Sequence, residues 1–217
     1  MSAHLSPDDL LDFYRRGVFP MAETRDAAQL FLVDPAERGV FPLDRFHVPK
    51  RLARTVRSDR FRVTKDQAFD QIMRLCAEAA PDREETWIND DILDLYGALH
   101  HRGHAHSVEC WENGTLVGGL YGVSLGAAFF GESMVSRATD ASKVALVHLV
   151  ARLIAGQYRL LDAQFYTAHL AQFGALVISR AAFRRQLQRA LAMTGNFNAL
   201  PEEASGAQVL QSIAHTS

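Results

Sequence analysis

Three polar side chains interrupt stretches of the sequence that are otherwise apolar. Glu132 lies inside "FFGESM", and Asp162 and Gln164 follow the apolar pair of "YRLLDAQ". Residues i and i+2 of a strand point to one side of the sheet, so Asp162 and Gln164 would lie together. Carboxyl and amide groups at the end of a buried strand need hydrogen-bond partners. They either take part in catalysis or cap the next helix and hold a loop.

Four histidines, His100, His101, His104 and His106, are the second group that could do chemistry. His104 and His106 would share one face of a strand, and His100 precedes His104 by four residues. The sequence has no His-Glu-x-x-His motif, and no cysteine or acid lies at ligand spacing before Glu109. Histidines near a helix end more often complement the helix dipole or pack at a sheet edge. We therefore expect no metal site here.

Composition limits the class of protein. A chain of 217 residues that is 48% hydrophobic can bury one sizeable core, and its net charge of −2 excludes a uniformly basic surface. Cys76 and Cys110 are its two cysteines, too few for a disulfide framework, which favours a reducing compartment. The N-terminus lacks a signal-peptide pattern, and no run reaches the ~18 apolar residues of a membrane span. We expect a cytoplasmic protein without membrane contact.

Hydrophobic periodicity predicts an α+β fold with a mixed sheet and helices on its faces. The predicted helices are 7–16, 66–80, 90–103, 141–156, 168–174 and 180–192, and the predicted strands are 104–112, 115–126, 127–134, 158–164 and 175–179. We place the end of a small N-terminal domain near Ser58, so that residues 1–58 precede a main domain of residues 59–217. The stretch after Pro201 has little pattern, and we expect it to be loosely held.

The pentapeptide "RGVFP" occurs twice, at residues 16–20 and 38–42. No similarity extends beyond the two copies, so a duplicated unit is not favoured. We interpret both copies as one local solution, in which glycine reverses the chain and an extended residue precedes proline.

A basic stripe is predicted on a helix that begins near residue 50. Lys50, Arg51, Arg54 and Arg57 recur at three- and four-residue spacing, which places them on one helix face. The stretch 45–62 holds seven lysines and arginines and one acid. Such a stripe suits phosphate contacts, although a solvated surface face is the alternative.

The sequence resembles the bacterial leucyl/phenylalanyl-tRNA–protein transferases along almost its whole length. The resemblance rests on "YRRGVFPMAE", "TWIND", "GHAHSVE", "LVGGLYGV", "FFGESMVSR", "TDASK", "LLDAQ" and "HLAQFGA", which occur in this order. It implies a small N-terminal domain joined to a GCN5-related acetyltransferase-like (GNAT) domain. It also implies transfer of leucine, phenylalanine or, less efficiently, methionine from aminoacyl-tRNA to an N-terminal arginine or lysine of an acceptor protein. The tagged protein is thereby marked for degradation by the N-end rule pathway, and no metal or coenzyme is implied.

The resemblance also implies roles for individual residues. The Asp-x-Gln strand serves the attack of the amine on the ester, so Asp162 would orient and polarise Gln164, and Gln164 would position the attacking nitrogen. The pocket for the side chain of the esterified amino acid would consist of Leu120, Phe129, Glu132, Met134 and Leu161. Glu132 could meet the aminoacyl ammonium at the rim, bond backbone groups at the floor, or merely tie adjacent strands together.

Recognition of the tRNA is implied in two places. Trp87 corresponds to an aromatic residue that stacks on the terminal adenosine. Its usual tryptophan partner is replaced here by the pair Phe31-Leu32, so Phe31 is the candidate substitute. The basic stripe from Lys50 to Arg57 would contact the acceptor stem through its backbone. We expect the enzyme to act as a monomer.

Three alternatives remain open. An acetyl-CoA-dependent N-acetyltransferase would need a glycine-rich turn where this chain has "SRATDASK". A leucyltransferase specific for N-terminal aspartate or glutamate matches the motifs less well. A catalytically silent tRNA-binding module would not require Asp162 and Gln164.

Overall fold

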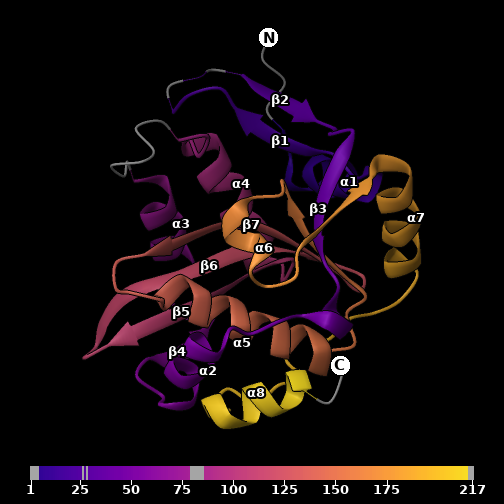
Figure 1. Ribbon diagram of the computed structural model, residues 1–217. Coiled ribbons are helices and arrows are strands. Elements are labelled where there is room, and N and C mark those ends of the chain that lie inside the picture. Colours follow the sequence, from indigo (N-terminus) through magenta and orange to yellow (C-terminus); the bar gives the residue numbers. More distant parts are fainter. Residues whose placement is uncertain (1–4, 26, 28, 79–85, 215–217) are drawn as a thin grey trace.

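A seven-stranded mixed sheet forms the centre of the protein (Figure 1). The computed structural model describes residues 5–25, 27, 29–78 and 86–214. The sheet has the order β4-β5-β6-β7-β8-β3-β9; β7 and β8 are parallel and the other neighbours are antiparallel. Its strands are β3 (Glu37–Phe41), β4 (Arg62–Lys65), β5 (Ala105–Glu112), β6 (Thr115–Leu125), β7 (Ala128–Ser136), β8 (Leu160–Gln164) and β9 (Leu176–Ser179). The predicted mixed sheet flanked by helices is confirmed.

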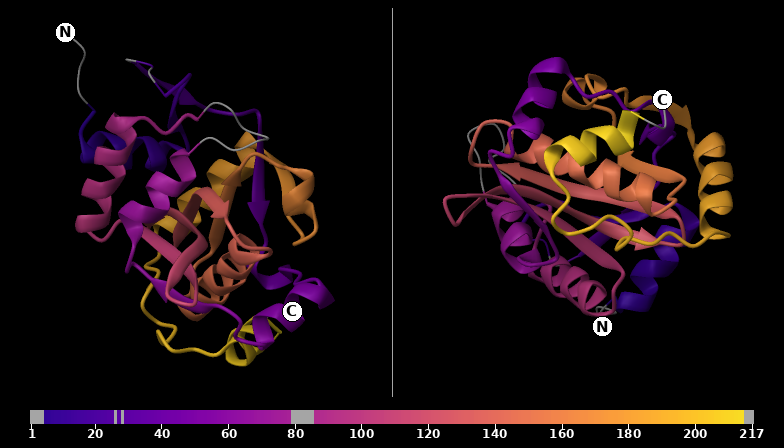
Figure 2. Two further views of the ribbon diagram at one scale, coloured as in Figure 1. Left: turned by 90° about the vertical axis from the view of Figure 1, so that its left-hand side faces the viewer. Right: turned by 90° about the horizontal axis from the view of Figure 1, so that it is seen from below.

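Helices cover both faces of the sheet and enclose two apolar cores (Figures 1 and 2). The helix α5 packs on one face with α2 and α8 outside it, and α1, α3 and α4 cover the other face. The helices are α1 (Pro7–Arg16), α2 (Lys50–Arg57), α3 (Phe69–Ala77), α4 (Asp90–His101), α5 (Ala141–Ala155), α6 (Ala168–Ala171), α7 (Arg180–Leu191) and α8 (Gly206–Ala214), with a 3₁₀ turn η1 (Leu43–Arg45). No helix in the described part of the chain is long and apolar enough to cross a membrane.

Several element boundaries follow from local chemistry that the sequence displays. Ser6 and Asp9 form a capping box at the start of α1, and Gly17 ends the helix with φ +79°. The Asn89 side chain accepts the N–H of Ile92, one of the free donors in the first turn of α4. Asn113-Gly114, with φ of 51° and 79°, joins β5 to β6 as the predicted hairpin turn.

Besides the 3₁₀ turn η1, four strands and one helix of the described residues were not predicted. They are the hairpin of β1 (Phe19–Ala22) and β2 (Leu30–Val33), the strands β3 and β4, and the helix α8. The expectation of a loosely held stretch after Pro201 is wrong, because Val209 and Ile213 of α8 are buried in the core beside α5. A nine-residue helix that buries two aliphatic side chains gives too short a pattern to recognise in advance.

The shared interpretation of the two "RGVFP" copies is also wrong. Gly17 of the first copy reverses the chain after α1, whereas Gly39 of the second copy lies inside β3. A Cβ atom on Gly39 would approach the backbone of Phe165 to 2.9 Å, so glycine is needed there for close approach and not for a turn.

The division into residues 1–58 and 59–217 stays a prediction. Two elements from the first segment contact the second one extensively. The strand β3 lies between β8 and β9, and α2 packs against α5 and α8. The first segment therefore contributes directly to the central sheet.

Candidate active site

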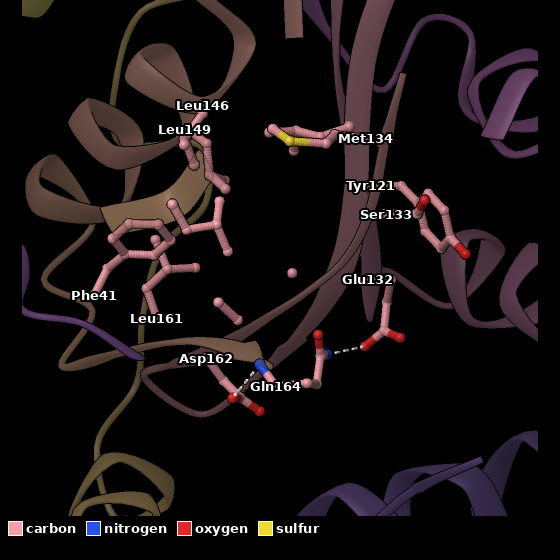
Figure 3. Close-up of a pocket in the computed structure, with 14 residues that line it drawn as sticks. Phe41, Tyr121, Glu132, Ser133, Met134, Leu146, Leu149, Leu161, Asp162 and Gln164 are labelled. Atoms are coloured by element: carbon pink, nitrogen blue, oxygen red, sulfur yellow. Dashed lines mark hydrogen bonds between the residues drawn. The ribbon is translucent and has the colours of Figure 1, made fainter. Parts of the chain in front are cut away.

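A pocket lies where the parallel strands β7 and β8 separate (Figure 3). Their pairing ends at Phe130 and Asp162, although β7 continues to Ser136 and β8 to Gln164. The pocket has a volume of about 130 Å³. Its lining is Phe41, Leu120, Tyr121, Gly131, Glu132, Ser133, Met134, Leu146, Leu149, Leu161, Asp162, Ala163, Gln164 and Leu170. Of the nine residues predicted for catalysis, for the side-chain pocket or for stacking on adenosine, the structure thus brings six together here: Leu120, Glu132, Met134, Leu161, Asp162 and Gln164.

A β-bulge explains how Glu132 enters this pocket. Tyr121 of β6 pairs with Ser133, whereas the next residue, Gly122, pairs with Gly131. Glu132 is therefore the additional residue of β7, and bulges of this kind redirect a side chain next to a site.

The same bulge changes which face the rest of β7 presents. Phe129 and Met134 are five residues apart, and an uninterrupted strand would point them to opposite faces. Both nevertheless pack in the core between the sheet and α5, while Val135 packs on the other side. The bulge thus allows Met134 to join the apolar wall of the pocket.

The apolar wall belongs to the α5 side of the sheet. The predicted residues Leu120, Met134 and Leu161 form part of it, and residues that the sequence did not indicate complete it. These are Phe41 from β3, Leu146 and Leu149 from α5, and Leu170 from α6. Phe129 lies behind the wall, fully buried and stacked on Phe197, and does not line the pocket.

Asp162 is fully buried and paired with Arg38, an arginine that the sequence did not indicate as a site residue. Arg38 of β3 donates from Nε at 2.9 and 3.1 Å to the two carboxylate oxygens and from Nη2 at 2.6 Å to Oδ2. A third donor of Arg38, Nη1, bonds the carbonyl of Gly17 at 3.1 Å. The guanidinium also lies over the rings of Phe19 and Phe183. A bidentate pair of this kind occupies both carboxylate oxygens of Asp162, so they do not face a substrate amine.

Asp162 contacts Gln164 through the backbone. The Gln164 N–H donates to Asp162 Oδ1 at 2.9 Å, and this bond holds Gln164 in the left-handed region at φ +54°. The side-chain Nε2 donates to Glu132 Oε1 at 3.1 Å, which leaves the amide oxygen facing the pocket (Figure 3). The strained backbone thus aims the amide at the end of the strand.

Glu132 is held by hydroxyl groups from the opposite face of the sheet. Tyr14 of α1 donates to Oε1 at 2.6 Å, and Tyr96 of α4 donates to Oε2 at 3.3 Å. The two tyrosine hydroxyls also lie within hydrogen-bond distance of each other. Because each hydroxyl carries one proton, one of these three contacts lacks a donor when Glu132 is ionised. Burial raises the pKa of Glu132 to about 7, and the nearby Asp162 acts in the same direction against the tyrosine hydrogen bonds. Burial and the charge of Glu132 raise the pKa values of Tyr14 and Tyr96 well above the usual range, so both stay donors.

The two aromatic residues predicted to stack on adenosine lie on neighbouring segments. Phe31 is 47% exposed on β2, and Trp87 is half-buried just before α4. Asn89 Nδ2 donates to the carbonyl of Ala27 at 3.2 Å, which ties the segment before β2 to the start of α4. The sequence predicted the helix cap at Asn89 but gave no signal of this contact with Ala27.

The predicted basic stripe lies on α2. Lys50, Arg51, Arg54 and Arg57 are all exposed, while Leu52 and Val56 bury the opposite face of the helix. Arg51 also lines a second pocket beside the start of α5.

Other candidate groups have local partners. His106 Nδ1 bonds Asp66 at 2.9 Å, and His100 stacks on Phe69. The described residues contain no group of three or more histidine, cysteine, aspartate or glutamate side chains that could hold a metal ion. A Gly-x-Ser-x-Gly string at residues 122–126 covers the end of β6 and the first residue of the turn to β7, and its Ser124 hydroxyl bonds Tyr158. It is not the strand-to-helix turn of a serine hydrolase.

Comparison with known proteins shows the family to which the chain belongs. Residues 40–188 match the sequence model of the family described as leucyl/phenylalanyl-tRNA protein transferase. The chain is 60% identical over 210 residues to the leucyl/phenylalanyl-tRNA–protein transferase of Maricaulis maris, covering 97% of both chains. It is 61% identical to that of Caulobacter vibrioides, again over 97% of both chains, and 52% identical to that of Afipia carboxidovorans over 99% of this chain and 96% of the relative. The chain belongs to the leucyl/phenylalanyl-tRNA–protein transferase family, a family of aminoacyltransferases.

Proposed function

We propose that this protein transfers leucine, phenylalanine or, less efficiently, methionine from aminoacyl-tRNA to the N-terminal arginine or lysine of acceptor proteins. The tagged proteins would enter the N-end rule pathway in the cytoplasm. The observation that carries the proposal is a pocket that is apolar on one side of the sheet and polar on the other. An aliphatic or aromatic side chain fits the apolar half, where Met134 and the leucines adapt to its shape. The ester carbonyl would then lie near Gln164 and Glu132.

The reaction forms an amide from an ester that is already activated. The acceptor amine attacks the ester carbonyl, the C–N bond forms, and the 3′ oxygen of the tRNA leaves. An α-ammonium with a pKa of ~8 must first lose a proton. Glu132, with a pKa of about 7, is better matched to accept that proton than an ordinary carboxylate. The amide oxygen of Gln164 would accept a hydrogen bond from the amine and orient it.

In this proposal Asp162 is a positioning residue. Its carboxylate is occupied by Arg38 and by the backbone N–H of Gln164, so it acts through the conformation of Gln164. We also propose that the sheet around the β7–β8 separation, with α3, α4 and α5, is a GNAT-like domain and that residues 1–58 form the smaller companion. The enzyme would act as a monomer, without metal or coenzyme.

One assay separates this function from its alternatives. Labelled leucine on charged tRNA is offered to peptides that begin with arginine, lysine, aspartate or glutamate. Transfer to the arginine and lysine peptides supports the proposal, and transfer to the acidic peptides alone supports the sibling leucyltransferase. Binding of charged tRNA without any transfer supports the silent module. Acetylation of the peptides in the presence of acetyl-CoA would support an N-acetyltransferase instead.

The basic stripe on α2 gives a first prediction. We expect Arg51→Glu with Arg54→Glu to raise the KM for leucyl-tRNA at least about tenfold, because phosphate contacts become repulsive. The dependence of this KM on salt concentration should also become less steep. The matched control is Arg185→Glu with Arg189→Glu, which reverses two exposed charges on α7. Equal KM values for the two double variants would refute the stripe.

The adenosine site gives a second prediction. Stacking on Phe31 or Trp87 is worth ~1–3 kcal/mol, so each alanine variant should raise the KM for leucyl-tRNA about 5- to 150-fold. The control is Leu32→Ala, because Leu32 is 45% exposed next to Phe31 but points to the other side of β2. If Phe31→Ala behaves like Leu32→Ala, the base rests on Trp87 alone.

A further inference from the structure

A second pocket lies beside the first one, where β7 ends and α5 begins. Its volume is about 390 Å³, and its lining is mainly polar. The lining residues are Arg51, Ser136, Arg137, Ala138, Thr139, Asp140, Ser142, Lys143 and His169. We call it the phosphate pocket.

Basic side chains from separate parts of the fold converge on this pocket. Arg51 comes from α2, Lys143 from α5, His169 from α6 and Arg137 from the segment between β7 and α5. The one carboxylate of the lining, Asp140, lies 3.0 Å from the Lys143 ammonium and 3.6 Å from the Arg51 guanidinium. It therefore holds two of the cations side by side. Arg137 pairs with Glu78 outside the lining, so three cations face two carboxylates and the site keeps a net positive charge.

Side chains, and not the first amides of α5, supply the free donors. The N–H of Ala141 bonds the carbonyl of Ala138, and the N–H of Ser142 bonds the Ser136 hydroxyl at 3.1 Å. A pyrophosphate that needs open backbone amides is poorly served here. A single phosphodiester group that accepts from arginine and lysine fits better.

The phosphate pocket neighbours the pocket at the separation of β7 and β8, which we call the acyl pocket. The same three elements contribute residues to both linings. On β7, Met134 lines the acyl pocket and Ser136 lines the phosphate pocket. On α6, Leu170 lines the first and His169 the second, and α5 borders both. A ligand that places its acyl group in the first pocket can therefore extend its backbone into the second.

We infer that this pocket binds a backbone phosphate of the single-stranded 3′ end of aminoacyl-tRNA, next to the terminal adenosine. The inference rests on the proposed function and adds a site for the substrate of that reaction. Together with the exposed cations of α2, it defines a path for the nucleic acid from the acyl pocket along the edge of α5. Such contacts position the strand without reading its sequence.

The test adds a carboxylate to the pocket without removing any existing ion pair. Thr139 is an exposed residue of the lining, so Thr139→Glu changes the local charge and Thr139→Gln is the uncharged control of similar size. We expect Thr139→Glu to raise the KM for leucyl-tRNA about tenfold, because it repels the phosphate. The KM for 3′-leucyl-adenosine without a 5′ phosphate should stay unchanged, since that substrate does not reach the pocket.

A second variant tests the same site independently. Lys143→Gln should reduce the slope of log K against log salt for tRNA binding by about 0.7, the value for one contact to a single strand. Equal KM values for leucyl-tRNA in Thr139→Glu and Thr139→Gln, or an unchanged salt slope in Lys143→Gln, would overturn the inference. If the wild-type protein transfers no leucine at all, the proposed function fails while the binding test of Lys143→Gln still decides the phosphate site.

Discussion

Replacing Arg38 by methionine is expected to lower the free energy of unfolding by about 3–5 kcal/mol. The substitution leaves the fully buried carboxylate of Asp162 without the three Arg38 contacts that neutralise it. It also removes the guanidinium that lies between the rings of Phe19 and Phe183. Urea denaturation at neutral pH measures the change.

The two "RGVFP" copies provide the control for this prediction. Arg16→Met makes the same substitution in the first copy, where the side chain is exposed, and should change stability by less than about 0.5 kcal/mol. If Arg38→Met is no more destabilising than Arg16→Met, the buried pair does not stabilise the site.

The double variant Arg38→Met with Asp162→Asn tests whether Asp162 acts by positioning Gln164 or through its negative charge. It removes both charges but keeps an oxygen at position 162 that can accept the N–H of Gln164. Because neutralising both partners avoids a lone buried charge, most of the lost stability should return. If Asp162 acts by positioning Gln164, transfer should stay within about tenfold of wild type. Loss of transfer in a folded double variant would show that the charge itself is required.

The sequence indicated much of this site because part of it obeys simple periodicity. Asp162 and Gln164 stand two apart on a short strand, and both reach the pocket as the spacing suggested. The apolar residues Leu120 and Leu161 were assigned to a wall only through the resemblance to a family, not through periodicity. Periodicity thus locates residues along one strand but not their partners from other strands.

Glu132 illustrates a feature that periodicity cannot give. Its side chain meets Tyr14, Tyr96 and Gln164, and none of the three roles suggested in advance included the tyrosines. The contacts depend on a bulge between β6 and β7, which changes the facing of every later residue of β7. Tyr14 and Tyr96 lie in ordinary amphipathic helices, where a buried tyrosine gives no signal of its role.

Arg38 could not be recognised for a different reason. Its partner lies 124 residues further along the chain, and the short strand that carries it lies between Pro35 and Pro42. The repeat drew attention to the pentapeptide, but the two arginines differ completely in burial, since Arg16 is exposed and Arg38 is 1% exposed. Their roles differ because β3 lies between β8 and β9 in the sheet, and this pairing brings Arg38 to Asp162 of β8.

The raised pKa of Glu132, on which its proposed acid–base role rests, has a consequence for stability as well as for rate. Its pKa rises from 4.5 to about 7 in the folded protein, so the folded state holds a proton that the unfolded state has lost between these pH values. The contribution to stability is therefore complete below pH 4.5 and is lost as the pH rises through 7, by at most about 3 kcal/mol. Glutamine mimics the protonated carboxyl. Glu132→Gln should consequently gain stability relative to wild type at pH 8 and match it at pH 5.

The same substitution is expected to reduce kcat/KM for transfer about 10²- to 10⁴-fold, the usual effect of removing a general base. For the wild type, kcat/KM should rise as the pH passes about 7, where Glu132 becomes able to accept a proton. In Glu132→Gln this rise should disappear and leave only the one near pH ~8 that belongs to the acceptor amine. Tyr14→Phe is expected to keep both rises but to move the first one to higher pH. The tyrosine hydroxyl stabilises the ionised carboxylate, so its loss raises the pKa of Glu132 further. A Tyr14→Phe profile identical to that of wild type would mean that the group titrating near pH 7 is not Glu132.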